Sequence, residues 1–160
     1  MSKNFRENDL KVLGKIYEKK DDCAWSYANH KDPEYIAIDY PKDAERLGSV
    51  FVCEYKKDFF VFTGSYNVRF YYDEDLFNFE RRTFVAFVTS KIKPTLIAFI
   101  SNEDEDSSIF KPAIKKAMKA VVFGYDFRHS YIEEIYKSAS YIANDLDSLY
   151  DDILHEDDDR

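Results

Sequence analysis

An apolar stripe near the end of the chain sets the strongest limit on its fold. Between residues 131 and 154, apolar side chains recur every three or four positions without a miss. The stripe consists of Ile132, Ile135, Tyr136, Ala139, Ile142, Ala143, Leu146, Leu149, Tyr150 and Ile153. Ser130 and Glu133 precede it with the spacing of a capping box. The pattern predicts one amphipathic helix, roughly 36 Å long, that braces the rest of the fold.

The middle of the chain is rich in Val, Phe and Tyr, which are typical strand residues. Five such segments span residues 50–55, 59–63, 66–72, 81–89 and 95–100. The last two contain uninterrupted apolar runs at 84–88 and 96–100, which indicates central strands that are covered on both faces. We therefore expect an antiparallel or mixed sheet of about five strands.

Helical spacing also occurs from Asn8 onward and again after the polar loop 102–107. The chain is thus predicted to be an α+β fold, with an N-terminal helix and two C-terminal helices, the last one long and amphipathic. Between the first helix and the sheet, a short strand at 35–39 and a short helix at 41–47 are expected. Because no linker or repeat appears, we expect one domain over residues 1–154 and an acidic C-terminal tail over 155–160.

The negative charge of the chain is concentrated at its end. The formal net charge is −8, and residues 145–160 alone hold eight acids and one base. The chain as a whole has no basic footprint for nucleic acid, so direct nucleic-acid binding is not expected. An acidic end favours a basic protein partner, and a homodimer is left open because tyrosine is common at interfaces. The candidate partner-binding residues are Asp151, Asp152, Glu156, Asp157, Asp158, Asp159 and Tyr141.

One set of residues offers an enzymatic alternative. Asp39 ends a predicted strand, and Glu54 and Lys56 lie on another. This layout resembles the restriction-endonuclease-like nucleases, which implies acids that hold a divalent metal and a lysine that supports the attacking group. The chain departs from that family's pattern, because a further strand follows where a helix belongs. The histidines, cysteines and isolated glycines form no metal or phosphate motif, so no cofactor is expected.

The sequence predicts a cytoplasmic protein with reduced thiols, since it contains neither a secretory signal nor a run of apolar residues that could span a membrane. Its wealth of Phe, Tyr, Ile, Lys and Asn, all with AT-rich codons, is compatible with a phage or a low-GC bacterium. We expect a non-enzymatic interaction domain and, more specifically, a small phage or mobile-element inhibitor or regulator. It would bind a basic, nucleic-acid-handling host protein by occlusion, and the nuclease is the alternative.

Overall fold

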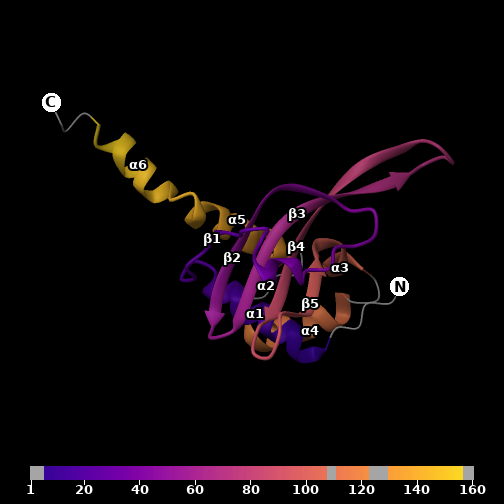
Figure 1. Ribbon diagram of the computed structural model, residues 1–160, viewed down its shortest axis with the longest axis horizontal. Coiled ribbons are helices and arrows are strands. Elements are labelled where there is room, and N and C mark those ends of the chain that lie inside the picture. Colours follow the sequence, from indigo (N-terminus) through magenta and orange to yellow (C-terminus); the bar gives the residue numbers. More distant parts are fainter. Residues whose placement is uncertain (1–5, 108–110, 123–129, 157–160) are drawn as a thin grey trace.

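A five-stranded antiparallel sheet forms the centre of the protein, which confirms the α+β prediction (Figure 1). The computed structural model describes residues 6–107, 111–122 and 130–156. The strands are β1 (Ser26–Tyr27), β2 (Glu45–Lys56), β3 (Phe59–Tyr71), β4 (Phe77–Thr89) and β5 (Thr95–Ser101). The helices are α1 (Glu7–Lys19), α2 (Pro33–Ile36), α3 (Asn102–Asp106), α4 (Lys111–Val121), α5 (Tyr131–Ala143) and α6 (Leu146–Leu154). The strand order follows the chain from β1 to β5.

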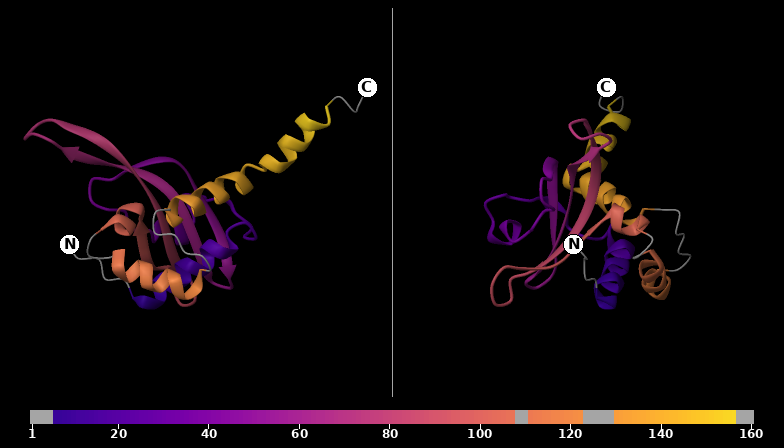
Figure 2. Two further views of the ribbon diagram at one scale, coloured as in Figure 1. Left: turned by 180° about the vertical axis from the view of Figure 1, so that it is seen from behind. Right: turned by 90° about the vertical axis from the view of Figure 1, so that its right-hand side faces the viewer.

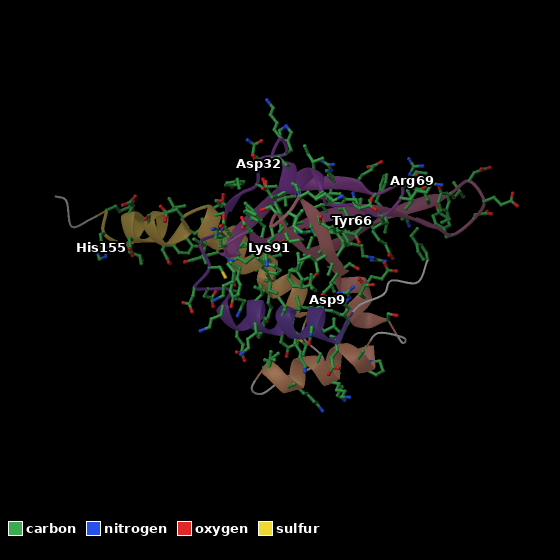
Figure 3. All side chains as sticks on the ribbon, turned by 60° about the horizontal axis from the view of Figure 1, so that its bottom comes forward. Asp9, Asp32, Tyr66, Arg69, Lys91 and His155 are labelled. Atoms are coloured by element: carbon green, nitrogen blue, oxygen red, sulfur yellow. The ribbon has the colours of Figure 1, made fainter. Side chains whose placement is uncertain are left out.

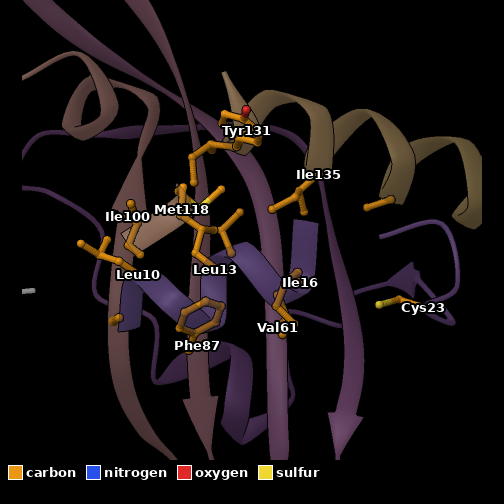
Figure 4. Packing of buried hydrophobic residues seen from close by; sticks show 14 of the residues in the cluster. Leu10, Leu13, Ile16, Cys23, Val61, Phe87, Ile100, Met118, Tyr131 and Ile135 are labelled. Atoms are coloured by element: carbon orange, nitrogen blue, oxygen red, sulfur yellow. The ribbon is translucent and has the colours of Figure 1, made fainter. Parts of the chain in front are cut away.

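Three helices cover one face of the sheet. Figure 2 shows α1, α4 and α5 together on this side, and Figure 4 shows their apolar side chains meeting those of the strands. Leu13, Met118 and Ile135, one from each helix, are fully buried there. They pack in the same cluster as Val61 and Phe87 of the sheet. Each such side chain contributes about 1.5–3 kcal/mol by leaving water.

The opposite face is covered by the segment between β1 and β2, where two expectations were wrong. Residues 35–39 were expected to form a strand, but α2 begins at Pro33, which suits the first turn of a helix. Residues 41–47 were expected to form a helix, yet β2 begins at Glu45. Asp43 has φ 65°, a left-handed conformation that ends helical geometry. Tyr35 and Tyr40 of this segment pack on the aromatic core of the sheet.

The predicted strand segments lie in strands, but 59–63 and 66–72 are parts of one strand and β1 was not predicted. Gly64 and Ser65, expected to form a turn, lie inside the long strand β3 and pair with residues of β4. A Cβ at Gly64 would lie 2.9 Å from Val50 Cγ2 and 3.1 Å from Phe84 Cε1, so glycine admits these neighbours. β4 is central, as its apolar run predicts, whereas β5 lies at the edge of the sheet.

The predicted terminal helix is divided in two. Asp145 has φ 52°, and this left-handed residue separates α5 from α6. Aspartate adopts that conformation more readily than most residues, because its short side chain forms local hydrogen bonds. α5 buries Tyr131, Ile132, Ile135 and Ala139 against the body, whereas α6 buries none of its residues. The stripe therefore braces the sheet over its first half only.

The close approach of α1 to α4 gives a first test of the fold. Gly14→Val is expected to lower the free energy of unfolding by about 1–3 kcal/mol, because overpacking forces neighbouring side chains to move. A Cβ there would overlap Cγ2 of Val121 and lie 3.3 Å from Met118 Sδ. Urea denaturation measures the change. Lys15→Val, at an exposed position of the same helix, controls for the helix propensity of valine. An equal loss in both variants would contradict this account of the contact.

Candidate interaction surface

The α6 helix projects from the body of the protein. Figures 1 and 2 show it continuing away from the sheet beyond the end of α5. The sequence-predicted Asp151, Asp152 and Glu156 are exposed here. Asp157, Asp158 and Asp159 lie outside the described residues, so their part of the prediction stays open. From residue 145 to 156 the chain contains five acids and neither lysine nor arginine, so this projection is strongly anionic.

The apolar side of α6 is open to solvent. Leu149, Tyr150, Ile153 and Leu154 are 49%, 51%, 50% and 74% exposed. At 3.6 residues per turn these four side chains fall within an arc of about 140°. Asp151 and Asp152 lie on the other side of the helix by the same geometry, and the exposed Glu156 follows the last residues of α6. α6 therefore combines an acidic face with an apolar face whose side chains are about half exposed or more.

Polar contacts tie the start of α6 to the body. The hydroxyl of Tyr27 in β1 donates to Oδ1 of Asn144, and Asn144 Nδ2 donates to the carbonyl oxygen of Ser140 at 2.7 Å. The Tyr141 hydroxyl donates to Oδ1 of Asp147 at 2.6 Å. This bond to a carboxylate raises the pKa of Tyr141 to about 12. Tyr141, proposed from the sequence as a contact residue, thus bridges α5 and α6.

The Tyr141 ring also approaches Tyr150 on α6, with 6.2 Å between the ring centroids in a T-shaped arrangement. Such an arrangement of aromatic rings is favourable. Its hydroxyl and its ring therefore both contact α6, and Tyr141 supports the first turns of that helix while remaining partly accessible.

A second projection is the outer end of the β3–β4 hairpin, residues 69–79, which we call the hairpin arm. Figure 3 shows Arg69 on this arm and His155 beyond α6 at opposite ends of the molecule. The exposed large side chains of the hairpin arm are Phe70, Tyr71, Tyr72, Leu76 and Phe79. The guanidinium of Arg69 lies 4.8 Å from the Phe77 ring centroid. Neighbouring rings of Tyr71, Phe77 and Phe79 also contact one another. The hairpin arm is therefore a ribbon with aromatic side chains, ending in the acidic residues 73–75.

The residues of the nuclease hypothesis do not all line one cavity. Glu54 and Lys56 border a cavity of about 410 Å³ beside the end of α1, together with Asp22. Asp39 is not among the residues that line it. Instead, its neighbour Ile38 belongs to the core on the face covered by α2. No group of three His, Cys, Asp or Glu that could hold a metal ion occurs within the described ranges.

Sequence reasoning missed the most accessible apolar surfaces. The stripe placed Leu149, Tyr150 and Ile153 in the core, because periodicity gives the side of a helix but not what covers that side. Asn144 and Asp145 were the available signal, since both residue types tolerate the left-handed conformation that ends α5. On the hairpin arm, strand propensity described Phe70 correctly but contained no information about exposure, and the predicted strand 81–89 left out Phe79.

In the part of the chain that the structure describes, no helix is both long and apolar enough to cross a membrane. No protein-family model matches the sequence, and neither the curated proteins nor the solved structures contain a match.

Proposed function

We propose that this chain is a non-enzymatic protein-interaction domain that inserts α6 into an apolar, basic-rimmed groove of a partner protein. The observation that carries the proposal is a nine-residue amphipathic helix with no buried residue. An isolated helix of that length is marginal in water, and packing of its apolar face supplies most helical stability in proteins. A groove that covers Leu149, Tyr150 and Ile153 would provide that packing.

The charge of α6 selects the kind of partner. Asp147, Asp151, Asp152 and Glu156 flank the apolar face, and none of the salt bridges formed by the described residues involves them. Like charges on a partner would be repelled, whereas lysine and arginine at the rim of its groove would speed encounter and set the orientation. A nucleic-acid-handling protein has such a surface. In its most specific form, the proposal is a phage or mobile-element inhibitor that occludes that surface.

Partner capture with matched helix variants tests this proposal. Wild-type protein is expected to enrich a basic protein from host extract, and Leu149→Ser/Ile153→Ser should reduce the enrichment at least tenfold. The reason is that each buried aliphatic side chain contributes about 1.5–3 kcal/mol. Ser148→Gln changes the polar side of the same helix and should leave capture intact. Because all three positions are exposed, the melting temperatures of the variants should match.

The captured protein then has to behave as the charge argument requires. Its affinity should fall with added salt, and Asp151→Asn/Asp152→Asn should weaken both the affinity and its salt dependence. Addition of the wild-type chain should displace nucleic acid from the partner. Equal capture by wild type and by the Leu149/Ile153 variant would refute docking through α6. A stable homodimer that depends on the same two residues would show that a second copy occupies this face instead.

A further inference from the structure

The topology brings the two cysteines of the chain together. Cys23 follows α1, and Cys53 lies in β2. β1 runs antiparallel to β2, with Ser26 opposite Val52 and Tyr27 opposite Phe51, so the residues that precede β1 continue along β2 toward Cys53. Both cysteines line one cavity beside the end of α1. They are thirty positions apart in the sequence, and the fold makes them neighbours.

Both cysteines are buried at the edge of the core. The Cys23 thiol donates to the carbonyl oxygen of Lys19 at 3.1 Å. Cys23 is 8% and Cys53 4% exposed, and both border the 410 Å³ cavity beside α1. Figure 4 shows Cys23 at the margin of the helix-covered core. A small oxidant entering this cavity would meet both thiols.

We propose that Cys23 and Cys53 form a reversible intramolecular disulfide that fixes the start of β1 to β2. A thiolate of the pair attacks a low-molecular-weight disulfide such as oxidised glutathione, and one glutathione thiolate leaves. The second cysteine loses its proton and attacks the mixed disulfide, which releases the other glutathione. The two cysteines are oxidised by two electrons in total, and one glutathione disulfide is reduced to two glutathione molecules.

The burial of the two cysteines also sets the rate of thiol–disulfide exchange. Burial raises the pKa of the Cys23 thiol to about 12 and also raises the pKa of Cys53. Because thiolate is the attacking species, exchange should be slow at neutral pH and should accelerate as pH rises. The expected behaviour is a dithiol that stays reduced in a reducing compartment and closes under sustained oxidation. Closure would also restrain Tyr27, which contacts Asn144 at the junction of α5 and α6.

Oxidation of the folded full-length protein tests the proposal. In buffers of increasing glutathione disulfide content, intact mass should fall by two hydrogen atoms and peptide mapping should link Cys23 to Cys53. Closing this loop should raise the melting temperature by about 5–10 °C over the reduced chain. Cys53→Ser should show no such rise. Reduction by dithiothreitol should restore both thiols and the original melting temperature.

A relocated thiol provides the matched control. Cys23→Ser/Ala24→Cys keeps two cysteines at nearly the same separation along the sequence. Position 24 is exposed, however, whereas position 23 is buried. This variant should stop at a glutathione adduct under native conditions. The proposal is overturned if the wild-type chain keeps both thiols at high pH, stops at a glutathione adduct or links only to other molecules. It also fails if the relocated thiol closes as readily as Cys23.

Discussion

Replacing Ile135 by alanine is expected to lower the free energy of unfolding by about 2–5 kcal/mol, whereas Ile153→Ala should change it by less than about 0.5 kcal/mol. Both residues belong to the same apolar stripe in the sequence. Ile135 is fully buried in the helix-covered core, so its truncation removes apolar contacts and leaves a cavity. Ile153 is 50% exposed on α6, so its loss leaves no cavity in the core.

Chemical denaturation of the two variants measures this contrast directly, because the substitution is chemically identical at both sites. Under the proposed function the order reverses for binding. Ile153→Ala should weaken partner capture, while Ile135→Ala should leave capture unchanged at temperatures where that variant is folded. Similar destabilisation by both substitutions would show that α6 packs against the body in solution, and it would remove the basis for docking through this helix.

The second large effect concerns Glu105, which caps the start of α5 from a neighbouring helix. Its Oε2 accepts from the backbone N–H of Tyr131 at 2.9 Å. Its Oε1 accepts from the Ser130 hydroxyl at 2.8 Å and from the N–H of Ile132 at 3.3 Å. These bonds satisfy donors that the first turn of a helix leaves free. Burial nevertheless dominates and, with a smaller contribution from Asp106, raises the pKa of Glu105 from 4.5 to about 7.

This raised pKa makes the stability of the protein depend on pH. Between about pH 4.5 and 7 the folded chain keeps a proton on Glu105 that the unfolded chain has lost. The free energy of unfolding should therefore fall as pH rises through this window, by about 1–3 kcal/mol from this group. Glu105→Gln cannot ionise and keeps a carbonyl acceptor for the α5 donors, so this component of the pH dependence should vanish. Relative to wild type, the variant should gain stability as pH rises.

Denaturation curves from pH 4.5 to 8 provide the measurement. Glu103→Gln is the matched control, because Glu103 lies in the same short helix but is exposed. Glu103→Gln should therefore leave unchanged the pH dependence of the free energy of unfolding that Glu105 causes. If Glu105→Gln retained the pH profile of wild type, the carboxylate would not be the group that titrates in this window. Glu105→Ala should destabilise at every pH, because it removes the cap as well as the charge.

The sequence predictions were accurate where a residue pattern fits only one kind of environment. Burial of residues 84–88 on both faces was readable because an apolar run without polar alternation fits few other environments. Ser130 accepts from the N–H of Glu133 as the capping pattern predicts. By contrast, Gly64 marked a close contact with Val50 rather than a turn, and only the three-dimensional arrangement supplies that reason.

For the candidate site, the sequence predicted the negative charge of α6 but not the exposure of its apolar side chains. The acids of α6 were found from composition alone, because charge density is a property of the sequence. The exposure of its apolar face depends on where α5 ends, and one left-handed residue, Asp145, separates the two helices there. The proximity of Cys23 to Cys53 depends on the register of β1 against β2. The two residues of β1 set that register.

The strand order has a consequence for how the chain reaches this structure. Each of β2, β3 and β4 pairs with the strand that follows it, so three hairpins can close over short distances in the sequence. Local contacts of this kind favour rapid folding. The contacts of α1 with α4 and α5 join opposite ends of the chain. During synthesis, the sheet can therefore form and α1 can pack on it before α4 and α5 have emerged, so the contacts between helices are the last to be made.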